Sequence, residues 1–180
     1  MMTAVYVLLG LCVFCVVAVK IFFVVRGTEK FVLHKERRTP FEKLEQTDTS
    51  IKVVTTMELA NEGNQCGLIM DIIARPQLPF EQYDGMDVRG KVDRVDAPRE
   101  DDYFEAMLIY RRESVMLRVV LTLTARKGMS LKEALAHMVD FPIDIIYMES
   151  GRTPCHYTKT HIELTAEELA KLAGVQLAKD

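Results

Sequence analysis

The chain has 180 residues and a net charge of -3, and 49% of its residues are hydrophobic. Residues 1–43 carry seven basic and three acidic side chains, whereas residues 44–180 carry 16 and 23. A net-acidic domain repels phosphate backbones, so the composition argues against nucleic acid as a partner. Four cysteines in a chain of this length do not make a disulfide framework, and the sequence leaves open whether Cys66 and Cys155 are free.

The N-terminal segment is apolar along residues 4–25, with Lys20 as its one charge. A helix of this length spans about 33 Å, enough to cross a hydrocarbon core, so residues 1–26 are predicted to be a single-pass transmembrane anchor. The predicted membrane-interface residues are the cations within and after this segment: Lys20, Arg26, Lys30, Lys35, Arg37 and Arg38. The positive-inside rule then places the rest of the chain in the cytoplasm, although many N-terminal anchors have the opposite orientation.

Residues 27–50 are polar and charged, which predicts a juxtamembrane connector with little fixed structure. Alternation of apolar and polar residues follows, and it predicts strands over 51–60, 66–74, 86–95, 103–110, 115–125, 143–148 and 156–164. Short turns at 61–64 and 111–114 predict that the strands on either side pair as hairpins. Capping boxes that begin at Ser130 and Thr165 predict two helices.

The sum is a mainly β (α+β) fold. We expect a transmembrane helix and then, over residues 51–180, an antiparallel immunoglobulin-like β-sandwich with one inserted and one C-terminal helix. A single antiparallel sheet with helices on one face is the alternative. The turn Asn61–Asn64 followed by the strand that starts at Cys66 resembles the early hairpin of bacterial membrane-anchored immunoglobulin-like domains. The resemblance covers only about 25 residues, and a turn between two apolar strands is common among β proteins. No family or function therefore follows from it.

Cys155, His156 and His161 are weak candidates for a metal site, since zinc prefers sulfur and imidazole ligands. If His156 and His161 share a strand, their odd separation places them on opposite faces, and the spacing matches no standard signature. We therefore expect no metal, no cofactor and no catalytic residues, because the sequence has no nucleophile or phosphate-binding motif.

The loop over residues 75–83 contains two prolines and three apolar side chains, Leu78, Phe80 and Tyr83. Apolar side chains in a loop favour partner binding, and the alternative is that they fold back over one end of the sandwich. We expect a non-enzymatic accessory or scaffold subunit that contacts other proteins of a membrane complex. A membrane-tethered ligand- or metal-binding module is the alternative function.

Overall fold

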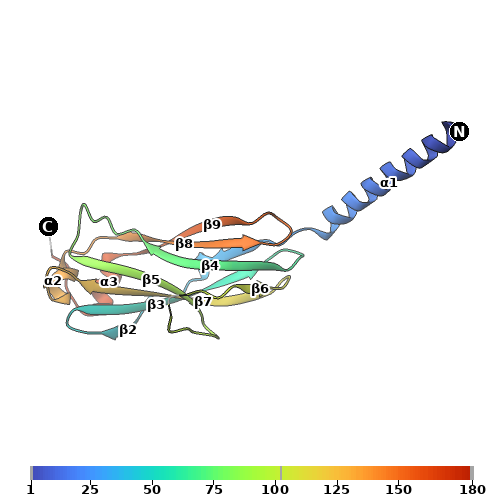
Figure 1. Cartoon of the computed structure of the whole chain (residues 1–180). Coiled ribbons are helices and arrows are strands. Elements are labelled where there is room, and N and C mark those ends of the chain that lie inside the picture. Colours follow the sequence, from blue (N-terminus) through green and yellow to red (C-terminus); the bar gives the residue numbers. More distant parts are fainter. Residues whose placement is uncertain (1, 102, 179–180) are drawn as a thin grey trace.

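The computed structural model describes residues 2–101 and 103–178, in which helix α1 (Met2–Arg26) projects from one end of a β-sandwich (Figure 1). Sheet A has the order β1-β3-β7-β5, and β2 also pairs with β3. Its strands are β1 (Phe31–His34), β2 (Glu42–Gln46), β3 (Ser50–Asn61), β5 (Met86–Arg94) and β7 (Ser114–Ala125). Sheet B has the order β6-β4-β8-β9 and contains β4 (Gly67–Pro76), β6 (Met107–Ile109), β8 (Phe141–Ser150) and β9 (His156–Leu164).

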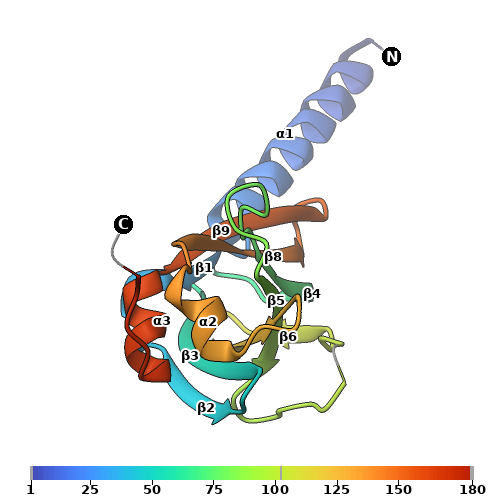
Figure 2. The same ribbon diagram turned by 90° about the vertical axis from the view of Figure 1, so that its left-hand side faces the viewer.

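The predicted fold class is confirmed: an antiparallel immunoglobulin-like β-sandwich follows the N-terminal helix. Alternate residues of the two long strands β3 and β7 fill the space between the sheets, so that Val53 and its cross-strand neighbour Leu121 are fully buried. Helices α2 (Leu131–Ala136) and α3 (Ala166–Ala173) lie at the end of the sandwich opposite α1 (Figures 1 and 2). The strand β7 lies between β3 and β5, as its two partly apolar faces predict.

Both predicted hairpins are wrong. Strand β3 pairs with β1, β2 and β7, whereas β4 pairs with β6 and β8, so the turn after Asn61 carries the chain from sheet A to sheet B. The turn between β6 and β7 crosses back to sheet A. A short turn suits an arch between sheets as well as a hairpin, and alternation shows which residues point inward without showing which sheet they belong to.

Residues 27–50 also differ from the prediction of little fixed structure. Strands β1 and β2 pair with successive halves of β3, which places Phe31 opposite Asn61 and Glu42 opposite Val54. The side chains of Phe31, Leu33 and Phe41 are buried. The reason is that the free backbone groups along β3 need partners, and this segment supplies them together with apolar residues for the core. The division of the chain into anchor, connector and domain stays a prediction.

The helix caps show how local sequence signals are used. The Ser130 hydroxyl accepts a hydrogen bond from the Glu133 amide, and the Glu133 carboxylate accepts one from the Ser130 amide at 2.8 Å, which confirms that capping box. At α3 the Thr165 hydroxyl caps the Glu168 amide at 3.1 Å. The Glu168 carboxylate instead accepts from the Phe41 amide at 3.3 Å and so ties α3 to the segment before β2.

Candidate functional site

Helix α1 is long and apolar enough over Val5–Arg26 to cross a membrane. None of its most apolar stretch is buried against the β-sandwich. Apolar surface of this extent is stable in an apolar solvent, whereas a core helix of a soluble domain would be covered by protein. The helix is therefore a candidate membrane-spanning segment.

The segment after α1 is fastened to the sandwich through Glu29, whose side chain is buried. Its carboxylate accepts hydrogen bonds from the amides of Arg152 and Thr153, each at 2.9 Å, and from the Thr153 hydroxyl. Burial disfavours the charged carboxylate, but these hydrogen bonds outweigh burial and lower the pKa of Glu29 to about 2. The Arg152 side chain adds a hydrogen bond to the Gly27 carbonyl at 3.2 Å. The turn between β8 and β9 thus holds the chain where it leaves α1.

The outer surface of sheet B carries an apolar patch, which we call the apolar face. It consists of Leu68, Met70 and Ile73 of β4, Leu108 of β6, Ile146 and Met148 of β8, and Tyr157 of β9. The strand register places these residues in rows across the sheet, for example Met70, Met148 and Tyr157. Ile73 and Leu108 are each 51% exposed and Tyr157 is 67% exposed. Contiguous apolar patches of this kind mark sites of protein or membrane interaction.

The outer surface of sheet A is different, because its charged groups are paired. The Asp93 carboxylate, which is buried, lies 3.0 Å from Arg118 and 3.7 Å from Lys91. On the same surface Lys52 pairs with Glu45 at 2.8 Å. The exposed Lys52–Glu45 pair is an ordinary surface ion pair. Asp93 and Arg118 instead form a partly buried pair beside an open hollow of about 750 Å³, and the Arg118 Nε atom has no hydrogen-bond partner among the described residues. The contrast between the sheets selects the apolar face as the candidate functional site.

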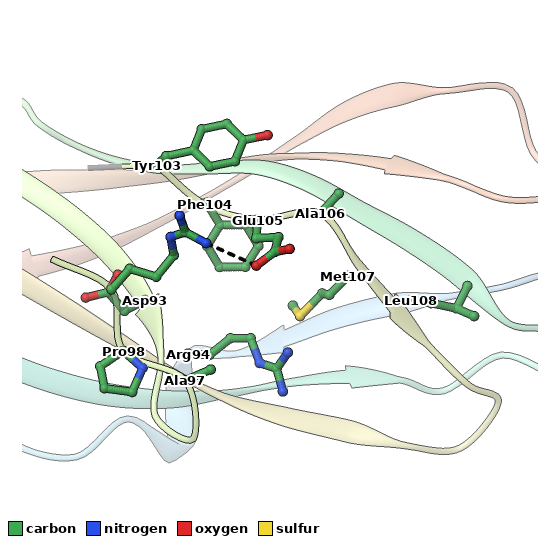
Figure 3. Close-up of a pocket in the computed structure, with 11 residues that line it drawn as sticks. Asp93, Arg94, Ala97, Pro98, Tyr103, Phe104, Glu105, Ala106, Met107 and Leu108 are labelled. Carbon is green, nitrogen blue, oxygen red and sulfur yellow. Dashed lines mark hydrogen bonds and ion pairs between the residues drawn. The ribbon is translucent and has the colours of Figure 1, made fainter. Parts of the chain in front are cut away.

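A hollow of about 470 Å³ lies beneath the loop that joins β5 to β6 (Figure 3). The Arg99 and Glu105 side chains form an ion pair of 3.1 Å, drawn as the dashed line in Figure 3. The described lining residues include no His, Cys or Ser, and the carboxylate of Asp93 is engaged by Arg118. The expectation that the chain is not an enzyme stays an expectation.

The three predicted partner-binding residues occupy different environments. Leu78 is buried in the core, and the Tyr83 hydroxyl donates a hydrogen bond to the Ala134 carbonyl of α2. Phe80 is 50% exposed, and the Arg126 guanidinium lies 5.8 Å from its ring centroid. These contacts agree with the alternative that the loop covers the end of the sandwich. A partner contact at Phe80 stays a prediction.

The weak metal candidates lie on or next to β9 and do not converge. His156 lies 3.0 Å from Glu149, whereas His161 pairs in register with Asp144, five residues further along the strand. Cys155 and Cys66 are both exposed and are not joined by a disulfide. The described residues contain no group of three or more His, Cys, Asp or Glu side chains placed to hold a metal ion. These positions give no support to the metal-binding alternative.

The predicted membrane-interface residues lie in two different parts of the structure. Lys20 lies within α1, and the Arg26 guanidinium lies 5.0 Å from the Phe22 ring centroid at its end. The others lie on the sandwich, where Lys30 pairs with Glu62 at 2.9 Å, Arg37 pairs with Glu58 at 3.1 Å and the Arg38 guanidinium lies 4.6 Å from the Phe41 ring centroid. Lys35 begins the short 3-10 helix η1 (Lys35–Arg37) after β1.

Sequence reasoning missed the apolar face, although a signal for it exists. Strands β4 and β8 have apolar residues on both sides, which predicts strands buried on both faces. In the structure one side of sheet B meets sheet A, and no described segment covers its other side, where the apolar residues remain accessible.

No family model and no curated protein matches the chain. Solved structures that are similar to it include two yeast domains. The crystal structure of the GAE domain of GGA2p from Saccharomyces cerevisiae has a TM-score of 0.34 and 9% sequence identity, and the match covers 77% of this chain and 98% of that chain. The yeast GGA1 GAE domain has a TM-score of 0.36 and 8% identity, with 69% and 87% covered. Both likenesses concern the fold alone. The class defined here is an immunoglobulin-like β-sandwich that follows a helix of membrane-spanning length.

Proposed function

We propose that this protein is a single-pass membrane-anchored accessory subunit, without catalytic activity of its own, whose β-sandwich binds another membrane protein. The observation that carries the proposal is the apolar face on sheet B. Its rows are rimmed by polar residues, since Arg75, Asp144 and His161 form the next row across the sheet. An apolar centre with a polar rim is the usual anatomy of a protein interface.

The position of the apolar face supports a partner in the same membrane. Its first row, Leu68 and Leu108, lies next to the turns that adjoin the end of α1. Its last row, Ile73 and Ile146 with Lys159 at the β9 end, lies four residues of β8 away, about 14 Å. The polar row with Arg75 lies beyond it. The apolar part of sheet B is therefore the part nearest the anchor, where another membrane-held protein reaches it most easily.

Substitution of Met148 by lysine tests this function. A charge at the middle of the apolar face is expected to reduce partner binding roughly tenfold or more, as for a buried interface residue. A photo-crosslinking amino acid at Tyr157, which is highly exposed in the same row, should give an adduct with an integral membrane protein in native membranes. The Met148→Lys variant should lose that adduct.

The matched control is Met116→Lys. Met116 is 44% exposed on the outer surface of sheet A and lies opposite Glu58 in the register, so that a lysine there meets an acidic neighbour. This variant should keep the adduct. Equal loss in both variants, or no adduct at all, contradicts the proposal. An adduct of two copies of the chain would replace the accessory role by self-assembly.

We further propose that the sandwich faces the cytoplasm, because the cations near the anchor follow it along the chain. Cys66 and Cys155 are exposed and serve as natural labels for the side of the membrane. A membrane-impermeant maleimide should label the protein only after the cells are permeabilised, and a variant with both cysteines changed to serine should stay unlabelled. Labelling of intact cells would place the sandwich outside.

A further inference from the structure

Four arginines that are far apart in the sequence gather at the end of the sandwich from which α1 projects. They are Arg26 at the end of α1, Arg111 and Arg112 in the turn between β6 and β7, and Arg152 in the turn between β8 and β9. We call them the arginine collar. In Figure 1 the turns that bear them lie at the α1 end of the sandwich.

Hydrogen bonds tie the collar to the chain just after α1. Arg152 donates to the Gly27 carbonyl at 3.2 Å, and Arg112 donates to the Asn64 side-chain oxygen at 2.9 Å. The Asn64 amide donates in turn to the Thr28 carbonyl at 3.0 Å. These bonds use uncharged acceptors, so they position the guanidinium groups without pairing them with a carboxylate. Lys30 and, as a smaller cause, Arg112 lower the pKa of the nearby Glu62.

The acidic groups at this end are largely engaged elsewhere. Glu29 is buried and hydrogen-bonded by the turn before β9, and Glu62 pairs with Lys30 at 2.9 Å. Among the described residues, the collar arginines make no ion pair with a carboxylate within 4.0 Å. Glu113, which follows Arg112 in the same turn, is the third acidic side chain at this end. The four collar arginines and Lys30 therefore exceed Glu29, Glu62 and Glu113 by two charges, although residues 44–180 as a whole are acidic.

Contacts with α1 show at what height along the helix the collar arginines lie. The Arg152 guanidinium lies 5.1 Å from the ring centroid of Phe23, which is within the apolar helix. Arg26 and Arg111 also line a shallow hollow of about 390 Å³ together with Val25. If α1 spans a bilayer, these side chains lie at the level where its headgroups begin.

We propose that the arginine collar binds the phosphates of anionic lipid headgroups and so holds this end of the sandwich against the membrane. The proposal rests on the membrane anchoring proposed above. Guanidinium groups match phosphate oxygens in geometry and charge, and juxtamembrane cations are attracted to anionic leaflets. Tyr110, 57% exposed beside the collar, adds an aromatic side chain of the type enriched at the membrane interface.

The basic residues Lys35, Arg37 and Arg38, expected at the interface from the sequence, lie further away. The Thr39 amide bonds the Thr56 carbonyl, whereas Phe31 lies opposite Asn61 at the α1 end of β3. Arg37 pairs with Glu58, which lies three residues from Asn61 along β3. Three residues of strand correspond to about 10 Å, somewhat more than the Debye length of about 8 Å at physiological salt. The two sets of cations can therefore be compared directly.

The test uses the full chain with Tyr110→Trp, since the protein has no tryptophan of its own. It is reconstituted in nanodiscs of phosphatidylcholine, with or without phosphatidylglycerol, that contain brominated lipid as the quencher. Tryptophan quenching should be stronger with phosphatidylglycerol and should weaken as salt is raised. Arg111→Gln with Arg112→Gln should lower the membrane-docked population roughly tenfold or more.

Two matched controls separate the collar from general charge effects. Lys35→Gln with Arg37→Gln removes the same charge and should leave the quenching unchanged, and Phe80→Trp at the opposite end should stay unquenched. Equal quenching in both bilayers, or equal loss in the two double variants, overturns the collar. A chain that is not retained in nanodiscs overturns the anchoring and the collar with it, whereas retention without lipid-dependent quenching overturns the collar alone.

Discussion

Replacement of Asn61 by aspartate is expected to lower the free energy of unfolding by about 3 to 5 kcal/mol. Asn61 is 1% exposed, and its side-chain oxygen accepts hydrogen bonds from the amides of Lys30 at 3.2 Å and Gly63 at 3.0 Å. Its side-chain nitrogen donates to the carbonyls of Gln65 at 2.8 Å and Ile109 at 3.1 Å. A carboxylate keeps both acceptor roles, but it faces two carbonyl oxygens without a proton to donate.

The measurement is urea unfolding of the full-length protein in mild detergent, followed by near-UV circular dichroism of its six tyrosines. Asn64→Asp is the control in the same turn. Asn64 is exposed and its side-chain oxygen accepts from Arg112 at 2.9 Å, which a carboxylate also does, so the change should stay within about 0.5 kcal/mol. Equal unfolding midpoints for the two variants would show that the side chain of Asn61 does not hold this crossing between the sheets.

The second large effect is expected at Glu29. Its pKa in the folded protein is lowered from 4.5 to about 2, so the ionised carboxylate stabilises the fold by about 3 kcal/mol. Because the folded-state pKa lies below the unfolded value, this stability is fully present above pH 4.5. It is lost as the pH falls from 4.5 towards 2. Glu29→Gln should therefore be less stable than the native chain at pH 7, and the difference should shrink across that interval.

The same urea titration at several pH values measures this effect. Glu81→Gln is the control, because Glu81 is exposed in the loop between β4 and β5 and its side chain forms no ion pair with any described residue. That variant should follow the native pH dependence closely. A difference between Glu29→Gln and the native chain that persists unchanged to pH 2 would mean that the clamp depends on the shape of the side chain and not on its charge.

The failure of the predicted hairpins has a clear physical origin. Strands β3 and β4 read correctly as strands because alternation is a local property of the chain. Their pairing is not local, because β3 lies beside β7, which begins more than fifty residues later in the chain. The intervening chain forms β4 and β6 of sheet B as well as β5 of sheet A. The buried Asn61 side chain donates a hydrogen bond to the Ile109 carbonyl of β6 and also bonds its own turn. From the sequence alone, Asn61 is predicted only to be a turn residue.

At the candidate site too, local features could be predicted from the sequence, whereas contacts between distant segments could not. The apolar residues of β4 and β8 were visible in the sequence, but a strand with two apolar faces reads as buried on both sides. The collar arginines lie in three separate segments, and nothing in their spacing indicates that they meet. The basic residues that stand together in the sequence, from Lys35 to Arg38, instead run along β3 away from α1.

The apolar helix, the positions of most strands, the capping box at Ser130 and the sandwich class could all be predicted from the order of the residues. These features depend on composition, on periods of two and 3.6 residues, and on hydrogen bonds between residues close in the chain. Three properties became visible only in the folded chain: which strands pair, which apolar surface stays exposed and which cations lie near the end of the helix. Those properties depend on contacts between segments that are far apart in the chain. Such contacts form only in the assembled fold, and no periodic pattern of residues indicates them.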